Sequence, residues 1–151
     1  MSTATFSGPL RAGTVREPST PLSAGFNVGN VVLSQSYDTG DLTGAVVGNV
    51  DTRIGTVPAG AQIVDIVVDQ VVASGTGTTT ISVGSASGGA QLMAAIATTA
   101  GGRFRGTATA ATQLAWQTST TADTALWVRN ATGTGTLTAG RAIITVLYVQ
   151  K

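Results

Sequence analysis

The run from Pro58 to Val72 (PAGAQIVDIVVDQVV) constrains this chain most, because it is the longest dense stretch of β-branched residues. A Pro-Ala-Gly turn begins it, and apolar side chains then alternate at period two, which is typical of a β-strand. Asp65 and Asp69 fall on the same face of this strand, so we expect that face to be mixed and the other to be fully apolar. The expected apolar face consists of Val64, Ile66, Val68 and Val72.

Shorter β-branched runs, separated by turns rich in Gly and Thr, predict the remaining strands. We expect them over Phe26–Tyr37, Arg53–Val57, Thr79–Val83, Thr112–Thr118, Thr124–Asn130 and Arg141–Val149, while Gln91–Thr98 fits a strand or a helical turn equally well. About eight short strands without a long helix indicate an all-β fold, an antiparallel β-sandwich or jelly-roll-like domain. We expect the apolar face of the longest strand to pack against the last one, at Ile144, Val146 and Tyr148. Aromatic residues are only 5% of the chain, so Trp116 and Trp127 are the expected large core residues.

Residues 1–24 differ in composition from the rest of the chain, since they contain three of its four prolines. Proline fixes φ and lacks a backbone donor, so this segment suits an extended path better than a central strand. The sequence therefore predicts an extended N-terminal arm over residues 1–24 and a β-sandwich domain over residues 25–151. A disordered tail is the alternative. Spaced apolar residues favour an arm that orders against a neighbouring subunit, namely Phe6, Leu10, Val15 and Leu22.

The surface of this chain must be weakly charged, because only 10% of its residues are charged and the formal net charge is +1. A surface built largely from Thr, Ser and Gly tends to associate with copies of itself or with partners. The eight basic residues are spread along the chain and form no stripe for a phosphate backbone, so nucleic-acid binding is not expected. The sequence has no signal-peptide h-region and no apolar run of about 18 residues, so no membrane partner is expected either.

The sequence offers little catalytic chemistry, because it contains neither His nor Cys. This excludes Ser-His-Asp and Cys-His catalysis, and a zinc site would have to be built from carboxylates alone. Asp65 and Asp69 on one strand would lie about 13 Å apart, whereas the carboxylates of a glycosidase lie about 5 to 9.5 Å apart. We therefore interpret them as solvated or interface positions, and we expect no enzymatic activity, no metal and no cofactor.

Two further motifs allow both a structural and a chemical interpretation. Asp38 to Gly40 (DTG) matches the tripeptide of aspartic proteases, but the residues on either side do not fit those enzymes, so we favour a turn. Arg103 to Arg105 (RFR) places an aromatic ring between two guanidinium groups, which could bind single-stranded nucleic acid. One triplet is weak support for that role, so we favour an exposed loop that contacts protein or water.

Short motifs are spread over residues 58 to 149: Pro58–Ala61 (PAGA) with Ile63–Ile66 (IVDI), Thr80–Gly84 (TISVG), Ala97–Gly102 (ATTAGG), and Thr138–Gly140 (TAG) before a strand that ends in Tyr148-Val149. Taken together they resemble small β-domain virion proteins of tailed bacteriophages, and head decoration (cement) proteins in particular. The segment Gly8–Thr14 (GPLRAGT) is similar to the N-terminal extensions that such proteins lay over a capsid.

The resemblance implies a non-enzymatic virion protein, made in the host cytoplasm, that binds the exterior of the capsid. Such proteins are often trimers and bridge major capsid subunits. The expected partners are then the major capsid protein and further copies of the chain itself. The residues expected to contact the capsid or another subunit are Phe6, Pro9, Leu10, Arg11, Val15, Arg16, Asp65 and Asp69.

Two other functions remain open from the sequence. A receptor- or glycan-binding module of a phage fibre or tail would use Trp116, Trp127 or the segment Arg103 to Arg105. Buried tryptophans would favour the decoration protein, and a tryptophan that lines an open groove would favour recognition. A tail-tube or connector subunit would form rings rather than trimers.

Overall fold

The computed structural model describes residues 32–44, 48–75, 79–105, 116, 120–133 and 136–150. The chain divides into two units, residues 1–31 and 32–151, and all described residues belong to the second. Three predictions therefore lie outside the described residues: the arm, the beginning of the strand expected at Phe26–Tyr37, and most of the strand expected at Thr112–Thr118.

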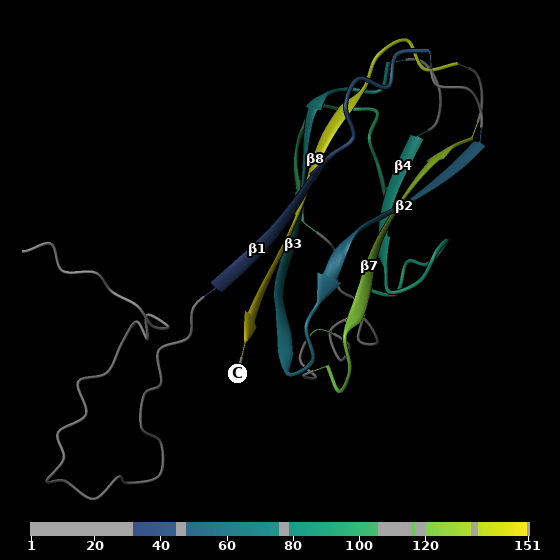
Figure 1. Ribbon diagram of the computed structural model, residues 1–151. Coiled ribbons are helices and arrows are strands. Elements are labelled where there is room, and N and C mark those ends of the chain that lie inside the picture. Colours follow the sequence, from purple (N-terminus) through teal and green to yellow (C-terminus); the bar gives the residue numbers. More distant parts are fainter. Residues whose placement is uncertain are drawn as a thin grey trace, which may run out of the picture. The chain divides into compact units, whose positions relative to one another are not determined.

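Eight β-strands make up most of the described residues: β1 Val32–Asp38, β2 Gly48–Val57, β3 Ala61–Val72, β4 Thr79–Gly84, β5 Met93–Ala97, β6 Gly102–Arg105, β7 Thr124–Thr132 and β8 Arg141–Gln150. They form two four-stranded sheets, with the order β1-β8-β3-β6 in the first sheet and β2-β7-β4-β5 in the second sheet. All paired strands are antiparallel, and the two sheets form two layers (Figure 1). This jelly-roll-like sandwich confirms the predicted all-β class.

Strand β3 confirms the strand predicted around Pro58 to Val72, but its two faces differ from the prediction. The register against β8 shifts between Ile63 and Asp65, so Val64 occupies a β-bulge. The extra residue brings Ile63 into the core together with Ile66, while Val64 is 51% exposed. A second shift follows Gln70, and Val72 is 43% exposed. The prediction that Val64 and Val72 belong to the apolar face is therefore wrong, because a bulge reverses the alternation of side chains.

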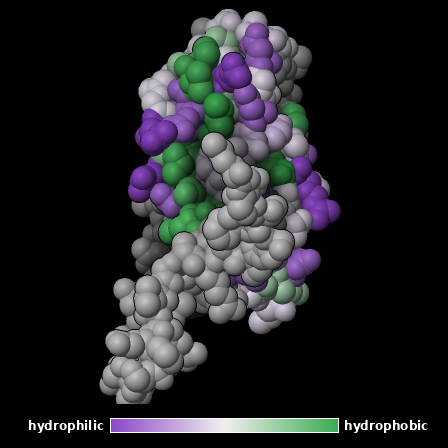
Figure 2. Space-filling view, turned by 60° about the vertical axis from the view of Figure 1, so that its left-hand side comes forward, coloured by the Kyte–Doolittle hydropathy of each residue, from purple (hydrophilic) through white to green (hydrophobic). Residues whose placement is uncertain are grey.

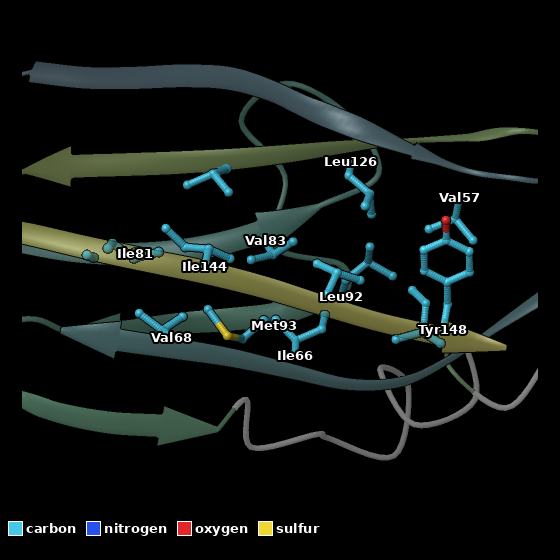
Figure 3. Packing of buried hydrophobic residues seen from close by; sticks show 14 of the residues in the cluster. Val57, Ile66, Val68, Ile81, Val83, Leu92, Met93, Leu126, Ile144 and Tyr148 are labelled. Atoms are coloured by element: carbon cyan, nitrogen blue, oxygen red, sulfur yellow. The ribbon is translucent and has the colours of Figure 1, made fainter. Parts of the chain in front are cut away.

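The hydrophobic core fills the space between the two sheets (Figure 3). In the first sheet, Val68 and Ile66 of β3 pair across the strands with Ile144 and Val146 of β8, and all are fully buried. The predicted contact between these two strands is thus confirmed as cross-strand pairing within one sheet. The second sheet supplies the opposing layer, with Val57, Ile81, Val83, Leu126 and Val128.

Two strand predictions are corrected, and one open choice is decided. Strand β2 begins at Gly48 and not at Arg53. The prediction missed its first half because that half has too few apolar residues for hydrophobic alternation to reveal a strand. Residues Gln91–Thr98 contain the strand β5 and not a helical turn. The segment Arg103 to Arg105, predicted as a loop, lies in the edge strand β6, because Phe104 packs against the core between two outward arginines.

The connection after β3 is a crossover between the sheets and not a hairpin. The sequence predicts a strand over Thr79–Val83 that returns after a tight turn, and β4 does occupy Thr79–Gly84. However, β3 belongs to the first sheet, whereas β4 pairs with β5 and β7 in the second sheet. The sequence predicts the strand Thr79–Val83, but it does not predict which of the two sheets this strand joins.

The two tryptophans lie in different environments. Trp116 packs partly buried against the core, and its indole N–H donates to the Leu92 carbonyl oxygen at 2.8 Å. Trp127 is not part of the core, because the strand alternation of β7 places Leu126 and Val128 inward and Trp127 on the outer face of the second sheet. The prediction of Trp127 as a core residue is therefore wrong.

Candidate interaction surface

The outer face of the first sheet carries an unusual number of apolar side chains. Strand β8 directs Ile144, Val146 and Tyr148 into the core, so the residues between them point outward. Such outward positions of an antiparallel sheet are normally polar. Here five apolar residues on β1, β3 and β8 share that face, and we call them the apolar stripe: Val32, Val67, Ile143, Leu147 and Val149.

The apolar stripe is only partly exposed. Val32 is 51% exposed, Ile143, Leu147 and Val149 are half-buried, and Val67 is 8% exposed. Among the described residues, five exposed large hydrophobic side chains come from β1 or β3, but only Val32 of these belongs to the stripe, and Leu33 faces the opposite side. Figure 2, which brings the side of the first sheet forward, shows a column of hydrophobic residues between hydrophilic flanks. Contiguous apolar surface of this kind marks sites of protein interaction.

Two ion pairs border the apolar stripe on the side of β6. Arg103 and Asp69 form a bidentate ion pair, in which Nε donates to Oδ1 at 2.5 Å and Nη2 donates to Oδ2 at 3.0 Å. Arg105 Nη1 lies 3.1 Å from Asp65 Oδ2. The hydrogen bond from Arg103 lowers the pKa of Asp69 below its ordinary value. The arginine side chains are 66% and 69% exposed, so their remaining donors face solvent.

A third ion pair, between Asp38 and Arg141, borders the stripe at the end of β1. Arg141 Nη2 donates to Asp38 Oδ2 at 2.5 Å, and the Gly40 backbone N–H donates to Asp38 Oδ1 at 2.9 Å. These hydrogen bonds, that of Arg141 first, lower the pKa of Asp38 to about 2. The bond to the Gly40 amide closes an Asx turn, which confirms the structural interpretation of this tripeptide.

The charges of this face are therefore neutralised within the sheet itself. Three aspartates, Asp38, Asp65 and Asp69, face three arginines. An unpaired charge is costly to bury. When this face is buried in an interface, every one of these charges keeps its partner. Asp65 and Asp69 pair with different arginines, so their geometry matches an interface better than acid-base chemistry.

Of the residues predicted to contact the capsid or another subunit, the structure describes only Asp65 and Asp69. Asp65 and Asp69 lie on one outer face, on either side of Val67. The other six residues lie outside the described residues: Phe6, Pro9, Leu10, Arg11, Val15 and Arg16. The sequence interpretation missed Arg103 and Arg105 as partners of the two acids. Their spacing of two residues, which puts both on one face of a strand, is the signal that could have identified them.

A cavity of about 140 Å³ opens between the sheets, and no charged side chain lines it. Asn130 Oδ1 is buried there without a hydrogen-bond partner. A polar cavity with an unpaired acceptor suits a few ordered water molecules. Its lining residues are Tyr37, Thr39, Leu42, Val50, Thr52, Val128, Asn130 and Thr132.

The described part of the chain offers neither a metal-binding group nor a membrane-spanning helix. No three His, Cys, Asp or Glu residues gather there in a way that could hold a metal ion. No helix among those residues is long and apolar enough to span a membrane.

The fold is similar to that of two chains in solved structures of bacteriophage capsids. One comes from the capsid asymmetric unit of cyanophage Pam1, with 21% identity, a TM-score of 0.58, and coverage of 91% of this chain and 98% of the other. The second comes from the capsid of Ralstonia phage GP4, with 22% identity, a TM-score of 0.56, and coverage of 90% and 92%. No family model and no curated protein matches the sequence.

Proposed function

We propose that this chain is a non-enzymatic structural protein of a phage virion that binds the outer surface of the capsid and bridges major capsid subunits. The observation that carries the proposal is the outer face of the first sheet, where the apolar stripe lies beside three neutralised ion pairs. The similarity of fold to chains of two phage capsids supports a role in the virion.

The character of this face favours a large protein partner over a small ligand. Stable protein interfaces have an apolar centre that is depleted in charge and a polar rim. The stripe provides the centre, and the exposed guanidinium groups of Arg103 and Arg105 provide donors at the rim. Copies of the chain also repel one another only weakly, because the net charge is only +1, and a low net charge promotes association.

Copies of the chain itself are the second partner in this proposal, most simply as a trimer on the capsid. Many weak contacts repeated around a symmetry axis add up by avidity, without any single strong contact. The N-terminal arm would extend these contacts through Phe6, Pro9, Leu10, Arg11, Val15 and Arg16, and Asp65 and Asp69 would contribute from the sandwich.

Binding to purified heads that lack the protein tests this function. We expect the wild-type chain to co-sediment with the heads and to appear on their exterior by cryo-electron microscopy. Replacing Leu147 in the stripe by Lys should weaken head binding at least tenfold. The matched change Ala131→Lys, on the outer face of the second sheet, should leave it within about twofold.

Deletion of residues 2–22 tests the arm separately. We expect this deletion to weaken head binding while the sandwich keeps its circular dichroism spectrum. Unchanged binding after the deletion would remove the arm from the proposal. Equal head binding of the Leu147→Lys and wild-type chains would show that the first sheet is not the contact face. A wild-type chain that does not bind heads and forms ring-shaped oligomers would instead favour a tail or neck as the site of action.

A further inference from the structure

The outer face of the second sheet holds an aromatic side chain whose N–H donor has no partner among the described residues. Trp127 lies between the buried residues Leu126 and Val128 of β7 and therefore points away from the core. Its ring is partly exposed, and its indole N–H donates to no described residue. The indole N–H of a tryptophan usually finds a hydrogen-bond partner where the ring is buried, so a free one at the surface is available to a ligand.

The residue beside Trp127 on β2 is a cation without an acidic partner among the described residues. Arg53 is the cross-strand partner of Trp127, and its Nη2 donates to Thr56 Oγ1 at 3.0 Å. The other arginines in the described part of the chain, Arg103, Arg105, Arg129 and Arg141, each pair with an aspartate. Arg53 alone among the described arginines has no carboxylate partner, so the guanidinium donors that Thr56 does not occupy remain for an external carboxylate.

On its other side Trp127 borders a wall made by the segment after β4. Its cross-strand partner there is Gly84, which adds no side chain. The backbone of Gly89 covers this glycine so closely that a Cβ would lie 2.6 Å from the Gly89 carbonyl carbon. The indole is therefore flanked by Arg53 on one side and by a backbone wall near Gln91 on the other.

We propose that Trp127 and Arg53 form a binding site for a saccharide that carries a carboxylate. The apolar C–H face of a pyranose ring would pack on the indole, whose N–H would donate to a ring hydroxyl. The planar guanidinium of Arg53 would hold the carboxylate with two parallel hydrogen bonds, a geometry that Lys cannot offer. This site is independent of the proposed capsid function, because it lies on the sheet opposite to the apolar stripe.

The surroundings favour a saccharide over a nucleic acid or a protein. Single-stranded nucleic acid needs a groove with successive cations and stacking rings, whereas Arg53 is the one cation here without an acidic partner. A protein interface needs an apolar centre several side chains wide. Around Trp127 the outer face is polar instead, with the Asp51–Arg129 ion pair one row away.

Isothermal titration with oligosaccharides of known charge tests the site. We expect saturable binding of trigalacturonic acid or 3′-sialyllactose, and at least tenfold weaker binding of their neutral counterparts galactotriose and lactose. Arg53→Gln and Trp127→Ala should each weaken binding at least tenfold. Arg103→Gln removes the same charge from the opposite face and should change affinity less than twofold.

Three results would overturn the proposal. The first is the lack of saturable binding for both acidic probes, and the second is unchanged affinity in Arg53→Gln. The third is equal or tighter binding of a 12-nucleotide single strand or of an acidic peptide, which would indicate a nucleic-acid or protein partner. If Trp127→Ala fails to fold, Trp127→Phe and Arg53→Gln decide the question, with folding checked by circular dichroism.

Discussion

Individual carboxylates of this protein are fixed by arginines from neighbouring strands. Asp51 on β2 is the most enclosed example, since Arg129 Nε donates to its Oδ1 at 2.8 Å and Ser87 Oγ to its Oδ2 at 3.0 Å. The hydrogen bond from Arg129 is the main reason why the pKa of Asp51 falls to about 2. Each such pair ties two strands of one sheet together, so these side chains act as cross-strand links.

Acid should therefore weaken the fold in a defined range. The pKa of Asp51 is lowered from 3.8 to about 2 in the folded chain, so its ionised form stabilises the fold above pH 3.8. This contribution is lost as the pH falls from about 4 through 2, where the folded-state carboxylate takes up its proton. We expect the urea midpoint to fall over that range, and to fall less steeply in Asp51→Asn.

The variant Arg53→Gln is the control for this experiment, because Arg53 has no acidic partner among the described residues. It should keep the wild-type dependence of the urea midpoint on pH. An Asp51→Asn profile as steep as that of the wild type would show that other carboxylates cause the acid response, with Asp38 the next candidate, since its pKa is also lowered to about 2.

Among the strands, β3 shows how a single inserted residue decides which side chains stabilise the fold. The bulge at Val64 reverses the alternation, so the residues on its two sides obey different registers against β8. Val68 is fully buried and Val64 is 51% exposed, although both are valines on one strand that alternation would place on one face.

The two valines therefore provide a matched pair of substitutions. Val68→Ala should lower the free energy of unfolding by about 2 kcal/mol, because it removes buried methyl groups and leaves a cavity. Val64→Ala should lower it by at most about 0.5 kcal/mol, as is usual for exposed sites. Urea unfolding followed by tryptophan fluorescence measures both, and equal losses would contradict the bulge.

The sequence predicts the strands of this protein better than their faces and partners. Period-two patterns identify β3, β4, β7 and β8, because alternation is a local property of a half-buried strand. The bulge at Val64, the outward position of Trp127 and the edge pairing of Arg103 depend on register and sheet order. These are set by contacts between residues far apart in the chain, and no local pattern records them.

In the molecule as a whole, the two sheets present outer faces of opposite character. The first carries the apolar stripe, and the second carries polar residues and the pair Asp51–Arg129 around the indole of Trp127. An asymmetric sandwich of this kind suits a protein with one covered and one solvent-facing side.

Association through the first sheet should make thermal stability depend on concentration. A folded oligomer that separates on unfolding has a Tm that rises with protein concentration. We expect this rise for the wild type, together with a mass above the 15.0 kDa of a single chain in sedimentation equilibrium. Leu147→Lys should abolish the rise and Ala131→Lys should keep it. A wild-type chain that stays at 15.0 kDa throughout would contradict association by this face.

The place of β8 in the first sheet also determines when this protein can fold. This strand, Arg141–Gln150, follows all others in the sequence, yet it lies between β1 and β3 and pairs with both. A growing chain on the ribosome holds β1 and β3 without the strand that joins them. The first sheet can therefore close only after β8 has left the exit tunnel, and until then the edges of β1 and β3 that β8 pairs with stay unpaired, which is the condition in which strand edges are most prone to aggregate.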